Sequence, residues 1–140
     1  MLMRRLPPTV RARIAAAALV PALLPALLPA AALFHLRLLR SAPATDAVLT
    51  RPPAAVHLWF SQRAELAVTR VRLVGPAGEV ALGPLQREAT GAGSERTVVA
   101  PVRGPMRPGA YSVEWRTMAA DGHSVSGQTS FRITAPAPAR

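Results

Sequence analysis

The sequence contains no cysteine and no lysine. Without cysteine the chain forms no disulfide bond, no thiolate metal site and no cysteine nucleophile. Negative charge is also scarce, because seven acidic residues stand against 17 basic ones, all of them arginine. Beyond the N-terminal segment these arginines are scattered singly, with few aromatic residues between them. This distribution indicates solvated strand faces and loops, and we expect no nucleic-acid partner.

Motifs of common enzyme chemistry are missing as well. The chain has no Gly-x-Gly-x-x-Gly run and no Gly-Lys-Ser/Thr run that would cradle a phosphate. The sparse acidic residues offer no candidate for a catalytic triad. The sequence therefore predicts a protein that is not an enzyme.

The N-terminus has a basic segment followed by an apolar one. Residues 1–13 carry four arginines and no acid, and residues 14–34 contain only Ala, Leu, Val, Ile, Phe and Pro. This order is typical of a secretory signal peptide, and the apolar run is also long enough to cross a bilayer. Its prolines argue against a stable helical anchor. We predict that residues 1–34 are a signal peptide or signal anchor, so the folded part lies outside the cytoplasm.

The cleavage position is open between two alternatives. Ala30 and Ala32 supply the small-residue pattern for cleavage after Ala32, whereas cleavage before His35 would leave Phe34 where a small residue is preferred. If the segment stays uncleaved, it is the only part of the chain that we expect to contact the membrane.

From residue 35 onward the pattern is that of a β-protein, without helical periodicity. Apolar and polar residues alternate in several short runs, and Tyr111, Val113 and Trp115 share one face. Residues 86–94, polar and rich in glycine, are predicted to be a mobile loop, and residues 135–140 a disordered tail. His57 is predicted to face solvent. The strands that the alternation predicts are residues 56–60, 69–74, 80–82, 96–102, 111–117 and 128–134. Such strands with Gly/Pro turns predict a two-sheet sandwich over residues 35–134.

The run Asp121-Gly122-His123 lies between the last two predicted strands. Residues i and i+2 of an extended segment project to the same side, about 6.5 Å apart. Asp121 and His123 would therefore both reach one small ion, and Gly122 permits the backbone twist that this needs. Asp-Gly is also a common turn pair, so an ordinary surface turn is the alternative.

Three segments of the chain resemble the periplasmic copper-resistance proteins of the CopC type. They are residues 35–44, residues 56–61 with their ending Trp59-Phe60-Ser61, and a C-terminal segment made up of residues 108–116, residues 120–127 and Phe131. The last segment is the most specific. The resemblance implies an immunoglobulin-like or cupredoxin-like Greek-key β-sandwich of about seven strands, located in the periplasm or on the outer face of the plasma membrane.

The resemblance also implies a site for one Cu(II) ion held by His35, Asp121 and His123. Nitrogen and oxygen donors of this kind suit Cu(II), which favours tetragonal sites. If cleavage occurs directly before His35, its free amine would be a further ligand. Imidazoles bind metal only when neutral, so binding should weaken as the pH falls through roughly 6.5. The implied role is copper resistance, sequestration or delivery to an inner-membrane copper transport protein.

The chain departs from the family pattern at three places, of which the first is Phe34 directly before His35, where a cleavage site has a small residue. Gln62 stands where many members carry glutamate, and residues 84–96 hold no Met or His where some members have a Met-rich Cu(I) segment. We therefore expect no Cu(I) site. Two other functions remain as alternatives: an immunoglobulin-like interaction module without a functional metal site, and a copper-dependent oxidase or monooxygenase. The second is less favoured because the carboxylate would fill a position that oxygen chemistry needs open.

Overall fold

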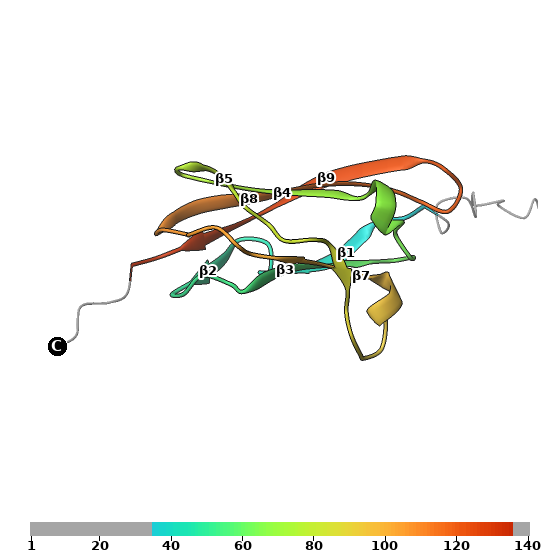
Figure 1. The fold of residues 1–140 in the computed structure, drawn as a ribbon, viewed down its shortest axis with the longest axis horizontal. Helices are drawn as coiled ribbons and strands as arrows, with labels where there is room; N and C mark the ends of the chain where they lie inside the picture. Colours follow the sequence, from blue (N-terminus) through green and yellow to red (C-terminus); the bar gives the residue numbers. More distant parts are fainter. Residues whose placement is uncertain (1–34, 136–140) are drawn as a thin grey trace, which may run out of the picture. The chain divides into compact units, whose positions relative to one another are not determined.

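Two β-sheets stack face to face in the computed structural model, which describes residues 35–135 (Figure 1). The predicted all-β sandwich is thereby confirmed. Its nine strands are β1 (Leu38–Ala42), β2 (Ala47–Leu49), β3 (Ala55–Phe60), β4 (Arg70–Gly75), β5 (Gly78–Val80), β6 (Gln86–Arg87), β7 (Thr97–Pro101), β8 (Gly109–Met118) and β9 (Ser124–Ile133). The predicted signal segment, residues 1–34, and residues 136–140 of the predicted tail lie outside the described residues.

The chain crosses repeatedly between the two sheets. One sheet has the order β1-β3-β7-β6 and the other the order β2-β9-β8-β4-β5. Within them, β2 pairs with β9 in parallel, and the other pairs are antiparallel. Two 3₁₀ turns, Leu66–Val68 and Ser94–Arg96, are the helical segments of the described chain. Among residues 35–135 no helix has the length and apolarity that a membrane crossing requires.

The structure has nine strands, more than the roughly seven predicted, because the sequence pattern does not reveal several short edge strands. β1 and β2 fall outside the predicted strands, and β6 lies within the segment predicted to be a mobile loop. These strands hold two to five residues each and are set by backbone pairing with a neighbour, so they show little alternation. β9 begins at Ser124, earlier than predicted, because its polar first half pairs in register with β8.

The predicted apolar faces form the core between the sheets. Phe60 from β3 meets Trp115 from β8 edge-on, with ring centroids 5.1 Å apart, and both are buried. Trp115 also lies against Gly127, its cross-strand partner, where an ideal Cβ would come within 2.6 Å of its Cζ2 atom. The wide indole therefore fits only because β9 has no side chain at this position.

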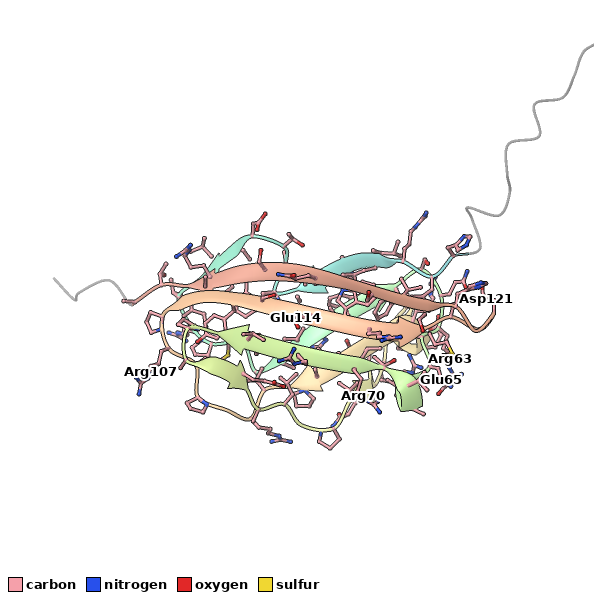
Figure 2. The ribbon with its side chains drawn as sticks, turned by 90° about the horizontal axis from the view of Figure 1, so that it is seen from above. Arg63, Glu65, Arg70, Arg107, Glu114 and Asp121 are labelled. Carbon is pink, nitrogen blue, oxygen red and sulfur yellow. The ribbon has the colours of Figure 1, made fainter. Side chains whose placement is uncertain are left out.

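The ends of the long β8–β9 hairpin mark the two ends of the domain. At one end, the Tyr111 hydroxyl donates to the Arg107 carbonyl oxygen (2.7 Å) and accepts from the Arg107 N–H (2.9 Å). At the other end, the chain turns between β8 and β9 at Asp121. Figure 2 shows Arg107 and Asp121 at these opposite ends, so the turn that holds Asp121 and His123 is far from the contact between Tyr111 and Arg107.

Candidate metal centre

Hydrogen bonds within the turn between β8 and β9 fix its shape. The N–H of Ala119 donates to the His123 carbonyl oxygen (3.0 Å), and the N–H of Gly122 donates to the Ala119 carbonyl oxygen (2.9 Å). Gly122 has φ of 85°, a left-handed conformation that glycine adopts without strain. The Asp121 Oδ1 accepts from the His123 N–H (3.0 Å). The turn therefore keeps its carboxylate and its imidazole together by local bonding alone.

The two side chains of this turn are in direct contact. The Nδ1 atom of His123 lies 3.1 Å from Oδ2 of Asp121. The pKa of Asp121 is lowered, first by the hydrogen bond from the His123 backbone N–H, then by that from the His123 side chain. The positive charges of His123 and His35 act in the same direction. Asp121 is therefore an anionic oxygen donor over the whole pH range in which imidazoles are neutral.

His35 approaches this turn from the start of the other sheet. It precedes β1, and its ring centroid lies 6.4 Å from that of His123, with the ring planes at 48°. Ser61, directly after β3, hydrogen-bonds to this segment. Its N–H donates to the Arg37 carbonyl oxygen (2.9 Å), and its Oγ accepts from the Arg37 N–H (3.1 Å). The Ser61 hydroxyl also donates to the His35 carbonyl oxygen (3.4 Å). Ser61 thus acts as a positioning residue that the sequence alone did not identify.

The spacing of the two rings is compatible with one shared metal ion. An imidazole nitrogen binds a divalent transition metal at about 2.0 Å, so two rings on one ion have centroids at most roughly 6 Å apart. The observed centroid separation of 6.4 Å is slightly longer than this limit. A small rotation of either side chain would bring the two rings within it. Within residues 35–135, however, no three His, Asp or Glu side chains already form a closed metal-binding group. The structure brings Asp121 and His123 into contact and places His35 beside them.

His57 is more enclosed than the predicted solvent-facing residue. Its Nδ1 lies 3.0 Å from Oε2 of Glu88, and its ring stacks on that of Trp59 with centroids 5.5 Å apart. The side chain is 29% exposed. Glu88 follows β6, in the segment that was predicted to be a mobile loop. The alternation of residues around His57 therefore could not predict this ion pair.

The family model of the CopC domain matches residues 38–134 of the chain. Among curated proteins, the chain is 28% identical to Protein YobA of Escherichia coli strain K12 over 100 residues, which cover 71% of this chain and 78% of that protein. It is also 28% identical to Copper resistance protein C of Pseudomonas syringae pv. tomato over 102 residues, covering 71% of this chain and 80% of that protein.

Two solved structures share the fold. CopC from Methylosinus trichosporium OB3b superimposes with a TM-score of 0.63 at 22% identity, covering 76% of this chain and 100% of that one. PcoC, a methionine-rich copper resistance protein from Escherichia coli, gives a TM-score of 0.62 at 24% identity, covering 71% and 99%. Asp121 and His123 lie within the segment that the family model matches, whereas His35 lies just before it.

Proposed function

The chain belongs to the CopC domain family, and we propose that it binds one Cu(II) ion outside the cytoplasm through His35, Asp121 and His123. The observation that carries the proposal is the approach of His35 to the Asp121–His123 turn, with the two imidazole centroids 6.4 Å apart. Copper is the cargo of the protein. Its role is copper resistance, by sequestering the ion or passing it to an inner-membrane copper transport protein.

The donor chemistry of this end of the domain suits Cu(II). Two imidazole nitrogens and a carboxylate oxygen are ligands that Cu(II) accepts in a tetragonal arrangement. The Nδ1 atom of His123 and Oδ2 of Asp121 lie 3.1 Å apart, a spacing at which both atoms would bind one ion in adjacent positions once Nδ1 has no proton. A free amine at His35 would supply a fourth donor if the chain is cleaved directly before it. The chain has no thiolate that would favour Cu(I).

Export and the absence of catalysis are parts of the same proposal. The basic and apolar order of residues 1–34 supports export. A carboxylate ligand beside the two imidazoles would occupy a position that oxygen activation needs open, which supports a carrier over an oxidase. The curated relatives named Copper resistance protein C support the same role.

The proposal is tested by Cu(II) titration against a competing chelator, with protein expressed from the full-length sequence. We expect His123→Ala to weaken Cu(II) binding by more than about 100-fold, since even changes outside the ligand set cost 10–100-fold. The matched control is His57→Ala, which removes another partly exposed imidazole. It should leave the affinity unchanged.

Spectroscopy of the copper-loaded protein supplies an independent measurement. Electron paramagnetic resonance should show coupling to at least two nitrogens. The intact mass of the same protein establishes whether the chain begins at His35 and so has a free amine there to bind copper. Wild-type affinity in His123→Ala, equal losses in both variants, or a spectrum with oxygen ligands alone would each overturn the proposal.

A further inference from the structure

The outer face of the five-stranded sheet carries two arginines directly opposite each other. In the register of β4 and β8, Arg70 is the partner of Arg116, and Arg72 is the partner of Glu114. Like charges in directly opposed cross-strand positions destabilise a sheet. The Arg70–Arg116 pair therefore has a cost that an anion between the two side chains would relieve.

The nearby carboxylates do not relieve this cost, because Arg72 engages both. Its Nη1 lies 3.0 Å from Oε2 of Glu114, and its Nη2 lies 3.0 Å from Oε2 of Glu79. Arg70 uses its Nη1 to donate to two backbone carbonyl oxygens just before β4. Within residues 35–135, the guanidinium group of Arg116 has no hydrogen bond or ion pair. Two guanidinium groups thus remain without a neutralising carboxylate.

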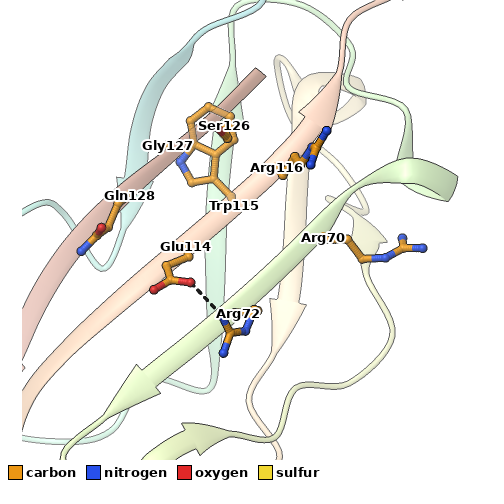
Figure 3. Close-up of a pocket in the computed structure, with 8 residues that line it drawn as sticks. All are labelled: Arg70, Arg72, Glu114, Trp115, Arg116, Ser126, Gly127 and Gln128. Carbon is orange, nitrogen blue, oxygen red and sulfur yellow. Dashed lines mark hydrogen bonds and ion pairs between the residues drawn. The ribbon is translucent and has the colours of Figure 1, made fainter. Parts of the chain in front are cut away.

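These arginines border a hollow of about 520 Å³ on the sheet surface (Figure 3). Ser126 and Gln128 of β9 line the same hollow and add neutral hydrogen-bonding groups beside Arg116. In Figure 3 the Glu114 carboxylate is directed toward Arg72, to which a dashed line joins it. The hollow therefore offers positive charge and hydrogen-bond donors in one open place.

We propose that this hollow docks a carboxylate-rich segment of a protein partner, with Arg70 and Arg116 as the residues that bind its carboxylates. A guanidinium group presents parallel N–H donors that match the two oxygens of a carboxylate. Ser126 and Gln128 pair with neighbouring polar groups of the segment. The proposal does not rest on copper binding, and it is tested on metal-free protein so that the two fail separately.

Local charge favours such a segment over a lipid surface. Around the hollow, three arginines face two glutamates, which leaves one net positive charge. A basic residue near an anionic membrane contributes about 1 kcal/mol, so one net charge is too few for stable attachment. The large apolar residues that are exposed in the described chain, Leu39, Val48 and Val68, do not line the hollow. Binding of two carboxylates, one by each arginine, depends on direct hydrogen bonds and does not require a large net positive charge on the surface.

The test uses protein expressed from the full-length sequence, stripped of metal, and a fluorescent poly-glutamate peptide followed by anisotropy. Arg116→Gln and Arg70→Gln should each weaken peptide binding about five- to tenfold, as expected for a charge-assisted pair of hydrogen bonds. Binding should also weaken as salt is added. The matched control is Arg132→Gln, which removes an exposed arginine of β9 outside the hollow. It should change the affinity by less than about twofold.

Several results would overturn the proposal. They are wild-type peptide binding in Arg116→Gln, an equal loss in Arg132→Gln, and equally tight binding of a poly-glutamine peptide. Vesicles containing phosphatidylglycerol that bind more tightly than the peptide, and lose binding in Arg116→Gln, would also overturn it in favour of a lipid surface.

Charge reversal separates docking from folding. Arg116→Glu would place a carboxylate opposite Arg70 and form the cross-strand ion pair that the wild-type sheet lacks. We expect its thermal midpoint to stay equal to the wild-type value or rise while peptide binding is lost. If this variant binds the peptide as tightly as the wild type, Arg116 is not a carboxylate-binding residue and the proposal fails.

Discussion

Substituting Asp121 by asparagine tests the metal centre with little disturbance of the turn. An asparagine oxygen would still accept the His123 N–H bond that Oδ1 accepts at 3.0 Å. The side chain is on an exposed turn, so the free energy of unfolding should change by less than about 0.5 kcal/mol. The carboxylate contact with the imidazole, Oδ2 to Nδ1 at 3.1 Å, is what the substitution removes.

Losing that contact affects His123 as well as Asp121. In the absence of metal, a carboxylate beside Nδ1 keeps the imidazole proton on Nδ1, and a carboxylate that only orients the ring would leave Nε2 to bind the ion. An asparagine amide facing Nδ1 would donate to it instead, which shifts the proton to Nε2. If Asp121 only orients His123, Cu(II) binding should weaken 10–100-fold. If Asp121 is instead a ligand, as proposed, the loss should exceed about 100-fold, or roughly 2.7 kcal/mol.

A competition titration with a chelator of known affinity, combined with electron paramagnetic resonance, measures this loss. The matched control is Asp46→Asn. Asp46 is also an exposed aspartate in a connecting segment; it accepts a hydrogen bond from Ser130 and has φ of 60°, which asparagine tolerates. Its substitution should leave copper binding unchanged. Wild-type affinity in Asp121→Asn, within a factor of about two, would refute both roles of the carboxylate.

Three further predictions concern stability. Gly127→Ala should lower the free energy of unfolding by about 1–3 kcal/mol, because the new methyl group would overlap the buried Trp115 ring; a urea midpoint equal to the wild type would contradict this. Tyr111→Phe should cost about 1–3 kcal/mol in the same assay by removing both bonds to the Arg107 backbone, with an unchanged m-value. The lowered pKa of Asp121 stabilises the folded state above the unfolded value, about pH 4, and this contribution is lost as the pH falls through the folded value. Thermal midpoints of wild type and Asp121→Asn should therefore converge in acid, and a constant difference would count against it.

The central strands were predictable because their apolar residues, which pack in the core, alternate with polar ones along the sequence. In β8, Tyr111, Val113 and Trp115 all face the core, as the spacing predicted. Edge strands follow a different rule. The five residues of β1 are set by backbone bonds to β3 and carry little pattern of their own. The first half of β9 was missed for the same reason, since β8 imposes a strand on its serines and glycine.

The candidate site likewise has one part that was predictable from the local sequence and another that depends on strand pairing. The sequence predicted that Asp121 and His123 project to the same side of the chain, and in the structure their side chains are in direct contact. The approach of His35 depends on the pairing of β1 with β3, which no local pattern specifies. Only the family resemblance indicated it. The role of Ser61 requires knowledge of which backbone groups meet at that strand end. The opposed arginines of the outer face likewise become visible only once the strand register is known.

The proposed ligands come from different sheets, and this has a consequence for copper release. His35 leads into the four-stranded sheet, whereas Asp121 and His123 lie on the hairpin of the five-stranded sheet. A shared ion would join the sheets at this end, in a protein without disulfides, and would stabilise the fold by about 2.7 kcal/mol at a free concentration 100 times the dissociation constant. The turn keeps its shape through its own hydrogen bonds, but the segment of His35 depends on Ser61. Movement of His35 would therefore open the proposed site by breaking contacts at one strand end, without breaking the hydrogen bonds of the turn.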